Sequence, residues 1–227
     1  GWCDRNKDES LRGRGYGLMD GKVADPEDPF HSFMLNAYAY LGLSRVVEML
    51  EEIDLEAAKR IALQAQELKG NIIDSLREAV LRSPVVPLSD GTWCPTVPPF
   101  AESSEMKALL VDKEDWFTHG TFTARDGIGP IYLALGEVLD SWDPVVTWIL
   151  DYSVDMFHQR NVFQSQPYYC PHSYIHLKRG EVKPFLKEFY NGFAALADRD
   201  TYTFWEHFYK VSPHKTHEEG WFLMQSR

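Results

Sequence analysis

Apolar residues recur at three- and four-residue intervals along most of the chain, which is the spacing of amphipathic helices. The longest such stretch runs from Leu55 to Leu81, and Asp54 is positioned to cap its first turn. Further helices are expected over residues 28–41, 44–53, 131–139, 144–158, 173–179, 182–197 and 201–209, and from 216 to the C-terminus. The pattern therefore predicts an all-α fold class.

Breaking residues set several of the expected helix ends. Asp28 followed by Pro29 is expected to open the first long helix, and Gly42 is expected to end it before a second helix begins at Ser44. In the helix over residues 182–197, the side chains expected to face the core are Phe185, Leu186, Phe189, Phe193 and Leu196.

A weak internal repeat runs through the helical pattern. Gly42, Gly136 and Gly180 each end a predicted helix, at spacings that are multiples of about 45 residues. That period suits one pair of helices with its turn, so we expect helical hairpins.

A proline-rich stretch at residues 83–105 interrupts the helical pattern, because proline excludes a regular helix. Val85-Val86 and Thr92-Trp93 flank the turn sequence Ser89-Asp90-Gly91, which predicts a short β-hairpin. A long non-helical segment inside a helical domain is typical of a functional loop.

Residues 1–26 are polar and glycine-rich and show no period, so they predict an extended N-terminal arm. Trp2, Tyr16 and Leu18 indicate that this arm packs against the rest of the protein. The sequence GRGYG at Gly13–Gly17 does not match a phosphate-binding loop, because no strand precedes it and no helix follows closely. We therefore expect an arm over residues 1–26 and a helical-hairpin domain over residues 27–227.

The composition fits a sizeable core, since 44% of the residues are hydrophobic and 14% are aromatic. A formal net charge of -11 argues against a nucleic-acid partner, which requires a basic surface. No apolar run approaches the ~18 residues that a membrane helix needs. We expect a soluble protein without a nucleic-acid or membrane partner, in a compartment that the sequence leaves open. Three cysteines are too few for a disulfide framework, although Cys94 could pair with Cys170.

Aromatic and imidazole side chains gather in the stretch QSQPYYCPHSYIH, residues 164–176, at a predicted junction between a loop and a helix. Tyrosine and tryptophan rings stack on the apolar faces of sugars, and their polar tips bond to hydroxyls. The alternative is ordinary core aromatics at helix ends. The candidate sugar-binding side chains, here and beside other loops, are Tyr168, Tyr169, His172, Trp93 and Trp205.

His172 and His176 lie four residues apart, so on a helix they share one face and could hold a metal. The zincin pattern is absent, because no glutamate lies between them in the required place. We expect both side chains to form hydrogen bonds, with no metal and no other cofactor.

Carboxylates at loop-to-helix junctions are the candidates for chemistry. Glycoside hydrolysis needs two of them, a protonated acid for the leaving oxygen and a base or nucleophile across the sugar ring. The candidates are Asp126, Glu206 and Glu218. Arg125, next to the first of them, is a further candidate for substrate binding. Glu219 is explained more simply by a capping box that begins at Thr216, and each candidate also has a structural interpretation as a turn residue or a solvated helix residue.

Four stretches follow one style of helical repeat: YAYLGLSRVVEML, PLSDGTWCPTVPP, GPIYLALGEVL and HLKRGEVKPFLKEFYNGFAALADRDTYTFWEHF. They resemble the six-hairpin, or (α/α) toroid, glycosidases. The resemblance implies helical hairpins around a central cleft, with aromatic side chains and the acid and base carboxylates on loops at one end. The chain supplies fewer helices than six hairpins contain. We therefore expect a toroid-like or partial toroid arrangement that further chain segments or another subunit would complete.

The expected function is that of a glycoside hydrolase acting on an oligo- or polysaccharide. Acid and base work is assigned to Asp126, Glu206 and Glu218, and substrate binding to Tyr168, Tyr169, His172, Trp205, Arg125 and Trp93. One alternative is a polysaccharide lyase, in which Tyr168 or His172 removes a proton and Arg179 neutralises the uronate. Another is a non-catalytic carbohydrate-binding or scaffold domain.

Overall fold

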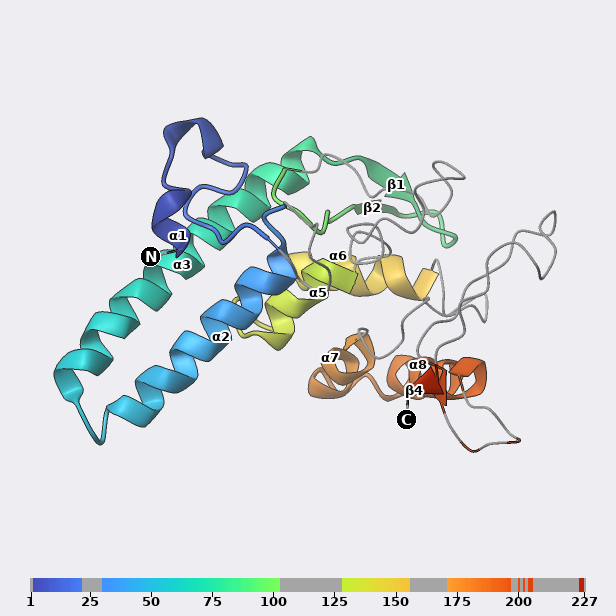
Figure 1. The fold of residues 1–227 in the computed structure, drawn as a ribbon. Coiled ribbons are helices and arrows are strands. Elements are labelled where there is room, and N and C mark those ends of the chain that lie inside the picture. The colour runs from blue at the N-terminus through green and yellow to red at the C-terminus, as the bar shows by residue number, and fades with distance from the viewer. Residues whose placement is uncertain are drawn as a thin grey trace. The chain divides into compact units, whose positions relative to one another are not determined.

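The computed structural model describes residues 2–21, 30–102, 128–155, 171–196, 200, 202, 204–205 and 225–226. Within these residues the chain forms seven α-helices, one short 3-10 helix and two small antiparallel sheets of two strands each (Figure 1). A mostly helical fold with a short β-hairpin is therefore confirmed, whereas the toroid arrangement stays a prediction. The chain divides into two compact units, Gly1–Tyr152 and Ser153–Arg227. The expected division at residue 27 also stays a prediction.

The first unit is built on a long helical hairpin of α2 (Phe33–Leu50) and α3 (Leu55–Arg82), which lie side by side (Figure 1). The prediction for α3 is confirmed almost to the residue. Asp54 caps the helix as expected, because its carboxylate accepts the Ala57 N–H at 3.0 Å. The helix stays regular through Gly70, whose position is open to solvent.

The helix α2 corrects two predictions. Its N-cap is Ser32, and Asp28 and Pro29 lie outside the described residues. Residues 33–50 form one continuous helix, so Gly42 does not end it. A glycine inside a helix costs only about 1 kcal/mol relative to alanine, and packing of α2 against α3 outweighs that cost.

The β-hairpin follows α3, as predicted, with β1 (Val85–Pro87) paired to β2 (Trp93–Pro95). Val86 lies opposite Cys94, and Pro87 lies opposite Trp93. The turn is closed by Asp90, whose carboxylate accepts the N–H of Thr92 at 2.8 Å and its hydroxyl at 2.7 Å. Local turn chemistry therefore sets the register of this hairpin.

Cys94 is a free, buried thiol, so the Cys94–Cys170 bridge does not form. Its sulfur lies 3.4 Å from the carbonyl oxygen of Trp148 in α6 (Pro144–Ser153). Burial, followed by the charge of Asp151, raises the pKa of the Cys94 thiol to about 11. Cys94 therefore acts as a small core residue between the hairpin and α6.

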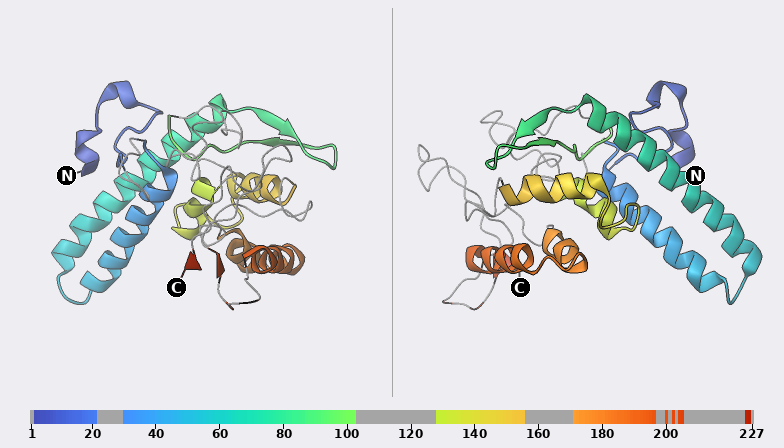
Figure 2. Two further views of the ribbon diagram at one scale, coloured as in Figure 1. Left: turned by 45° about the vertical axis from the view of Figure 1, so that its right-hand side comes forward. Right: turned by 180° about the vertical axis from the view of Figure 1, so that it is seen from behind.

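The core of the first unit lies where α5 (Ile128–Leu135) packs across α2 (Figure 2). Gly136, just after α5, lies so close to α2 that an added Cβ would be 2.7 Å from the carbonyl oxygen of Ala37. Asp143 caps α6, since its carboxylate accepts the Val145 N–H at 2.8 Å. The largest fully buried side chains here include Leu18, Phe33, Ile72, Leu76, Ile131 and Leu133.

The N-terminal arm packs against the first unit, as the sequence indicated. It contains α1 (Trp2–Arg5) and η1 (Glu9–Leu11). The buried side chain of Asn36 accepts the N–H of Met19 at 2.8 Å and donates to its carbonyl oxygen at 3.0 Å. Lys7 pairs with Glu67 of α3 at 2.7 Å. Polar contacts therefore hold a segment that has little regular structure.

The GRGYG sequence of the arm is a close-packing motif. Gly13, Gly15 and Gly17 all have positive φ angles, of 69°, 117° and 67°. An added Cβ would lie 2.7 Å from Glu78, 2.4 Å from the ring of His31 and 2.2 Å from Asn71, respectively. Both the backbone conformation and the lack of space therefore require glycine at these alternate positions.

The second unit contains a pair of packed helices, α7 (His172–Lys178) and α8 (Val182–Leu196). Their bounds agree with the prediction to within one residue. Gly180 ends α7 with a φ of 70°. Its N–H donates to Leu177, and the N–H of Glu181 donates to the carbonyl oxygen of His176 at 2.9 Å. This pairing is a Schellman motif, which places Glu181 beside the last turn of α7.

The two helices predicted near the C-terminus are wrong at the residues that the structure describes, because these residues form strands. Residues Phe204–Trp205 form β3, which pairs antiparallel with β4 at Gln225–Ser226. The remaining residues of both predicted helices lie largely outside the described part of the chain. Aromatic and threonine residues around 201–205 favour a strand once a partner segment is present.

The orientation of α8 differs from the prediction. Leu186, Phe189 and Phe193, expected to face inward, are exposed, and Phe189 is 52% exposed. Glu188 is instead buried, with 3% exposure. Phe185 is half-buried. The apolar stripe alone therefore does not set the rotation of this helix.

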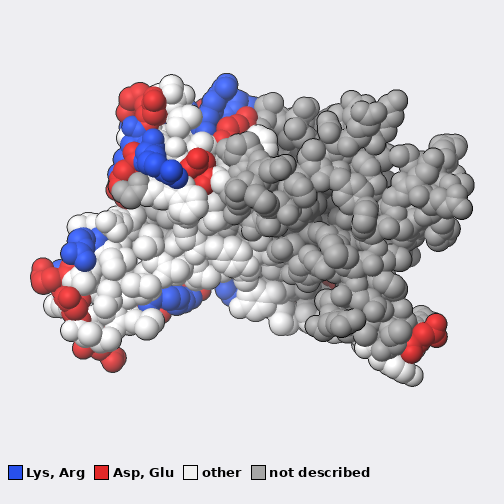
Figure 3. Space-filling view, in the orientation of Figure 1, with Lys and Arg blue, Asp and Glu red and all other residues white. Residues whose placement is uncertain are grey.

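Charged side chains of both signs are interspersed over the visible described surface (Figure 3). Several form ion pairs one turn apart on the long hairpin, such as Arg45 with Glu48 and Lys59 with Glu56. None of the described helices is both long and apolar enough to cross a membrane.

Candidate functional site

Some of the predicted site residues lie among the residues that the structure describes, and others lie outside them. Those outside the described residues are Asp126, Glu206, Glu218, Arg125, Tyr168 and Tyr169. Trp205 lies in β3, opposite Gln225. Trp93 and His172 are described with their side chains, in the first and second units respectively.

Trp93 lies on an exposed apolar face of the β-hairpin. Alternate residues of a strand share one face, so Val85 and Pro87 of β1 lie on the same face as Trp93 of β2. All three are exposed, and the indole of Trp93 is 68% exposed. The opposite face carries the buried Cys94. The hairpin therefore presents the indole of Trp93 to solvent on an apolar face.

His172 is the first residue of α7 and is 1% exposed. His176, one turn later, is also buried, so the two imidazoles lie on the inner face of the helix as their spacing predicted. Within the described part of the chain, no group of three or more histidine, cysteine or acidic side chains is arranged to hold a metal ion.

The ring of His176 lies between two carboxylates. Its Nδ1 is 2.5 Å from Oε2 of Glu181, and its Nε2 is 3.3 Å from Oε1 of Glu188. The second contact has the distance of an ion pair but not the alignment of a hydrogen bond. Arg179 donates its Nε–H to the other oxygen of Glu181 at 2.9 Å. The result is a buried ionic cluster of two acids, one guanidinium and one imidazole, which we call the α7–α8 cluster.

Burial acts on the pKa of His176 in one direction and the carboxylates act in the other. Desolvation of the ring lowers the pKa, because it disfavours the charged form. Glu188 and then Glu181 raise it through their charges and contacts, and the net effect is a pKa above the ordinary value. The charged imidazolium is therefore favoured in the α7–α8 cluster.

A second buried histidine lies in the first unit. The Nδ1 of His31 bonds to the Glu102 carboxylate, which also accepts the backbone N–H of His31 at 3.0 Å. Gly15 of the arm lies over the ring. Nearby, Arg82 donates to the carbonyl oxygens of Gly13 at 3.1 Å and Ala101 at 2.6 Å. This group joins the arm, the end of α3 and the segment after the β-hairpin.

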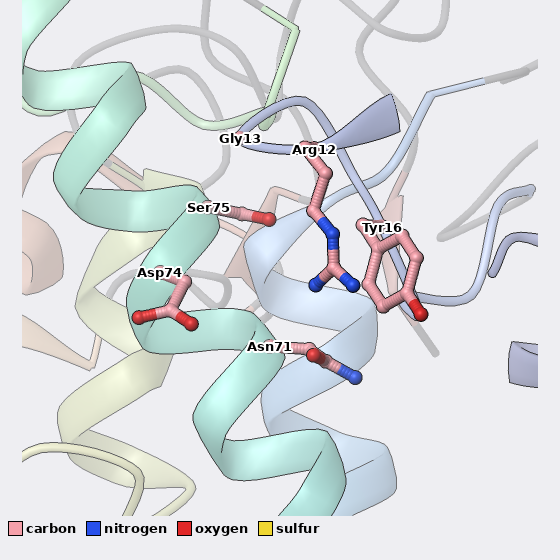
Figure 4. Close-up of a pocket in the computed structure, with 6 residues that line it drawn as sticks. All are labelled: Arg12, Gly13, Tyr16, Asn71, Asp74 and Ser75. Carbon is pink, nitrogen blue, oxygen red and sulfur yellow. The ribbon is translucent and has the colours of Figure 1, made fainter. Parts of the chain in front are cut away.

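A small hollow lies between the arm and α3, lined by Arg12, Gly13, Tyr16, Asn71, Asp74 and Ser75 (Figure 4). Its open volume is about 50 Å³, whereas ligand pockets typically enclose about 300 Å³ or more. The Arg12 guanidinium stacks over the Tyr16 ring, 3.4 Å from its centroid, and also pairs with Glu9. The hollow is therefore too small for a sugar ring.

The sequence interpretation missed the acidic partners of both buried histidines. Glu181 could have been found, because Gly180 was expected to end α7 and a Schellman motif brings the next residue against His176. Glu188 gives no such signal, since its neighbours in sequence suggest a solvated position. Glu102 and His31 lie far apart in sequence and meet only in the folded unit.

Comparison of the chain with protein-family models, with curated proteins and with solved structures finds no match. The described side chains provide Trp93, which is one of several exposed aromatic residues, and two buried histidine–carboxylate groups. The first suits contact with a ligand, and the second suits structural stability and response to pH.

Proposed function

We propose that the protein acts on glycans, as a glycoside hydrolase whose helical hairpins form part of an (α/α) toroid. The observation that carries the proposal is the exposed indole of Trp93 on the apolar face of the β-hairpin. A tryptophan presented on a rigid two-stranded support suits stacking against the apolar face of a sugar.

The helical pairs give further support. Two pairs of consecutive helices, α2 with α3 and α7 with α8, pack together across short connections, which is the repeating unit of such a toroid. The β-hairpin follows the C-terminal end of α3 directly. Substrate-binding loops of the resembled family occupy the same kind of position, at the ends of helical hairpins.

The proposed chemistry uses Asp126, Glu206 and Glu218 as the carboxylates from which the acid and the base are drawn. Tyr168, Tyr169, Trp205, Arg125 and His172 are proposed to contact the sugar with Trp93. His172 is buried in α7, so the proposal rests more on the exposed Trp93 than on His172.

The lyase alternative receives less support. It needs a cation for the uronate, and the assigned Arg179 already donates to Glu181. Its side chain is also largely buried. Lyase chemistry therefore remains an outcome of the experiments rather than a second proposal.

The first experiment tests glycan contact at the β-hairpin. Trp93→Ala is expected to weaken binding of soluble oligosaccharides by about tenfold, a loss of about 1.4 kcal/mol, measured by titration calorimetry over a panel of glycans. The matched control is Trp142→Ala, because Trp142 is 59% exposed but lies in the turn before α6. Equal effects of the two substitutions, or no binding of any glycan by the unaltered chain, would contradict the proposal.

The second experiment tests the chemistry. Asp126→Ala, Glu206→Ala and Glu218→Ala are made separately and assayed on the glycans that bind. Loss of turnover in two of the three, with new reducing ends and no unsaturated product from the unaltered chain, is the expected result. Unsaturated products would indicate a lyase, and binding without turnover would indicate a carbohydrate-binding domain.

A further inference from the structure

We infer that His176 is held as a doubly protonated imidazolium between Glu181 and Glu188, and that this charge fastens α7 to α8. The pair of helices then forms a pH-sensitive element, which loosens when alkaline solution removes the proton. This inference concerns the second unit alone and does not depend on the proposed glycan chemistry.

The hydrogen-bonding capacity of the groups favours this charge state when both carboxylates are ionised. An ionised carboxylate only accepts hydrogen bonds, and a neutral imidazole carries one N–H. His176 directs Nδ1 at Glu181, 2.5 Å away, and Nε2 at Glu188, 3.3 Å away. Both ring nitrogens must carry a proton if each is to face an acceptor without repulsion.

The three partners come from consecutive segments of the chain. His176 belongs to α7, Glu181 to the turn and Glu188 to α8. The Schellman motif at Gly180 and the bond from Arg179 hold Glu181 in place. Within the cluster, only Glu188 depends on the docking of α8. Among the contacts of the cluster, the one from Nε2 of His176 therefore joins the two helices.

Burial strengthens the interaction between the charged ring and Glu188. His176 and Glu188 are each 3% exposed, and a buried carboxylate without a cation is strongly unfavourable. The helix α8 turns Glu188 inward while Phe189 and Leu186, next to it in the sequence and on the stripe, stay exposed. The attraction between the ring and Glu188 favours this rotation of α8.

The charged and titratable groups at the ring are few among the described side chains of the second unit. On α7 they are His172, one turn earlier, and Arg179 at the C-cap. The turn contributes Glu181 and α8 contributes Glu188. Glu181 thus faces Arg179 and His176, Glu188 faces His176, and the formal charges of these four groups sum to zero when His176 is charged.

The direction of the pH dependence follows from the raised pKa of His176. A group whose pKa is higher in the folded state stabilises the fold fully below its unfolded pKa, and that contribution is lost as the pH rises through the folded pKa. The α7–α8 pair is therefore firmest in mildly acid to neutral solution and loosens in alkaline solution.

The direct test measures the protonation of the ring in the full chain by nitrogen NMR of the imidazoles. The signal of His176 is assigned by its disappearance in His176→Gln. At about pH 7 we expect both nitrogens to show the shifts of an imidazolium and to titrate above an ordinary histidine. A neutral ring at that pH, with its proton on Glu188 or absent, would overturn the inference.

A second measurement tests the mechanical consequence. Amide hydrogen exchange in α8 is compared with that in α3, which corrects for the intrinsic effect of pH. Protection of α8 relative to α3 is expected to fall between about pH 6 and about pH 9 in the unaltered chain. It should be pH-independent in His176→Gln, while Lys187→Gln, an exposed change on α8, should behave like the unaltered chain.

These results separate the inference from folding failure. If His176→Gln does not fold, the pH dependence of amide exchange in α8 of the unaltered chain decides between the outcomes. An imidazolium whose loss leaves α8 fully protected would show that the charge does not fasten the helices, and would also overturn the inference.

Discussion

The buried histidines of the two units, His31 and His176, begin with the same contact and differ in the next. Each directs Nδ1 at a glutamate, Glu102 in the first unit and Glu181 in the second. In the described part of the chain neither Nε2 has a hydrogen-bond partner, but that of His176 lies 3.3 Å from a carboxylate oxygen of Glu188. A ring that faces one carboxylate needs one N–H, and a ring that faces two needs two. The number of acids around a buried imidazole therefore decides whether it must carry a charge.

The two histidines also join different kinds of structure. His31 lies under an irregular arm that glycines and backbone carbonyls hold in place. His176 lies between two helices whose relative rotation depends on one buried acid. Close packing determines the surroundings of His31, and charge determines those of His176.

The largest expected effect concerns His176, where one substitution removes the charge and a second removes its buried partner. His176→Leu leaves Glu188 buried without its imidazole and is expected to destabilise the second unit by about 3 kcal/mol. Adding Glu188→Leu removes the stranded charge and should recover most of that loss. Urea denaturation of the single and double variants, with the unfolding of α8 monitored by hydrogen exchange, measures both effects. If the double variant is no more stable than the single one, the two residues are not coupled.

A smaller effect tests packing at the first position. Gly15→Ala places a Cβ against the ring of His31 at a positive φ, and should cost about 2 kcal/mol in the first unit. Gly70→Ala in α3 is the matched control, because it meets no neighbouring atom and lies in a helix. This control should stabilise the unit by about 1 kcal/mol. Thermal unfolding of both variants would show whether the arm is packed as tightly as its geometry indicates.

The smallest effect compares the acids. Glu102→Gln retains an oxygen that can accept from Nδ1 of His31, so we expect a loss of only about 1 kcal/mol. Glu188→Gln should do more than destabilise, because it should also lower the pKa of His176, as measured by nitrogen NMR. An unchanged titration of His176 in Glu188→Gln would remove the distinction between the two positions.

The parts of the fold that could be predicted from sequence are those set by local contacts. The cap of Asp54, the turn at Asp90 and the stop at Gly180 lie within a few residues of the atoms that they bind. These local signals predicted α3, the β-hairpin and the end of α7 correctly. Gly42 misled the prediction, because its local cost is smaller than the packing of α2 on α3.

The parts that could not be predicted depend on distant residues. Pairing of β3 with β4 joins residues 204–205 to residues 225–226, and it replaced a predicted helix with a strand. The rotation of α8 depends on Glu188 and His176. The exposed position of Trp93 was compatible with the sequence interpretation, and the proposed carboxylates Asp126, Glu206 and Glu218 lie outside the described residues.

The glycines of the arm have a consequence for how the sequence can vary. Positions 13, 15 and 17 have no room for side chains. Arg12, before the first of these glycines, and Arg14, between the first two, are exposed. A library of random substitutions would therefore show tolerance that alternates at every second residue. That pattern is usually taken as the mark of a strand, and here it would come from a turn-rich segment pressed against a helix.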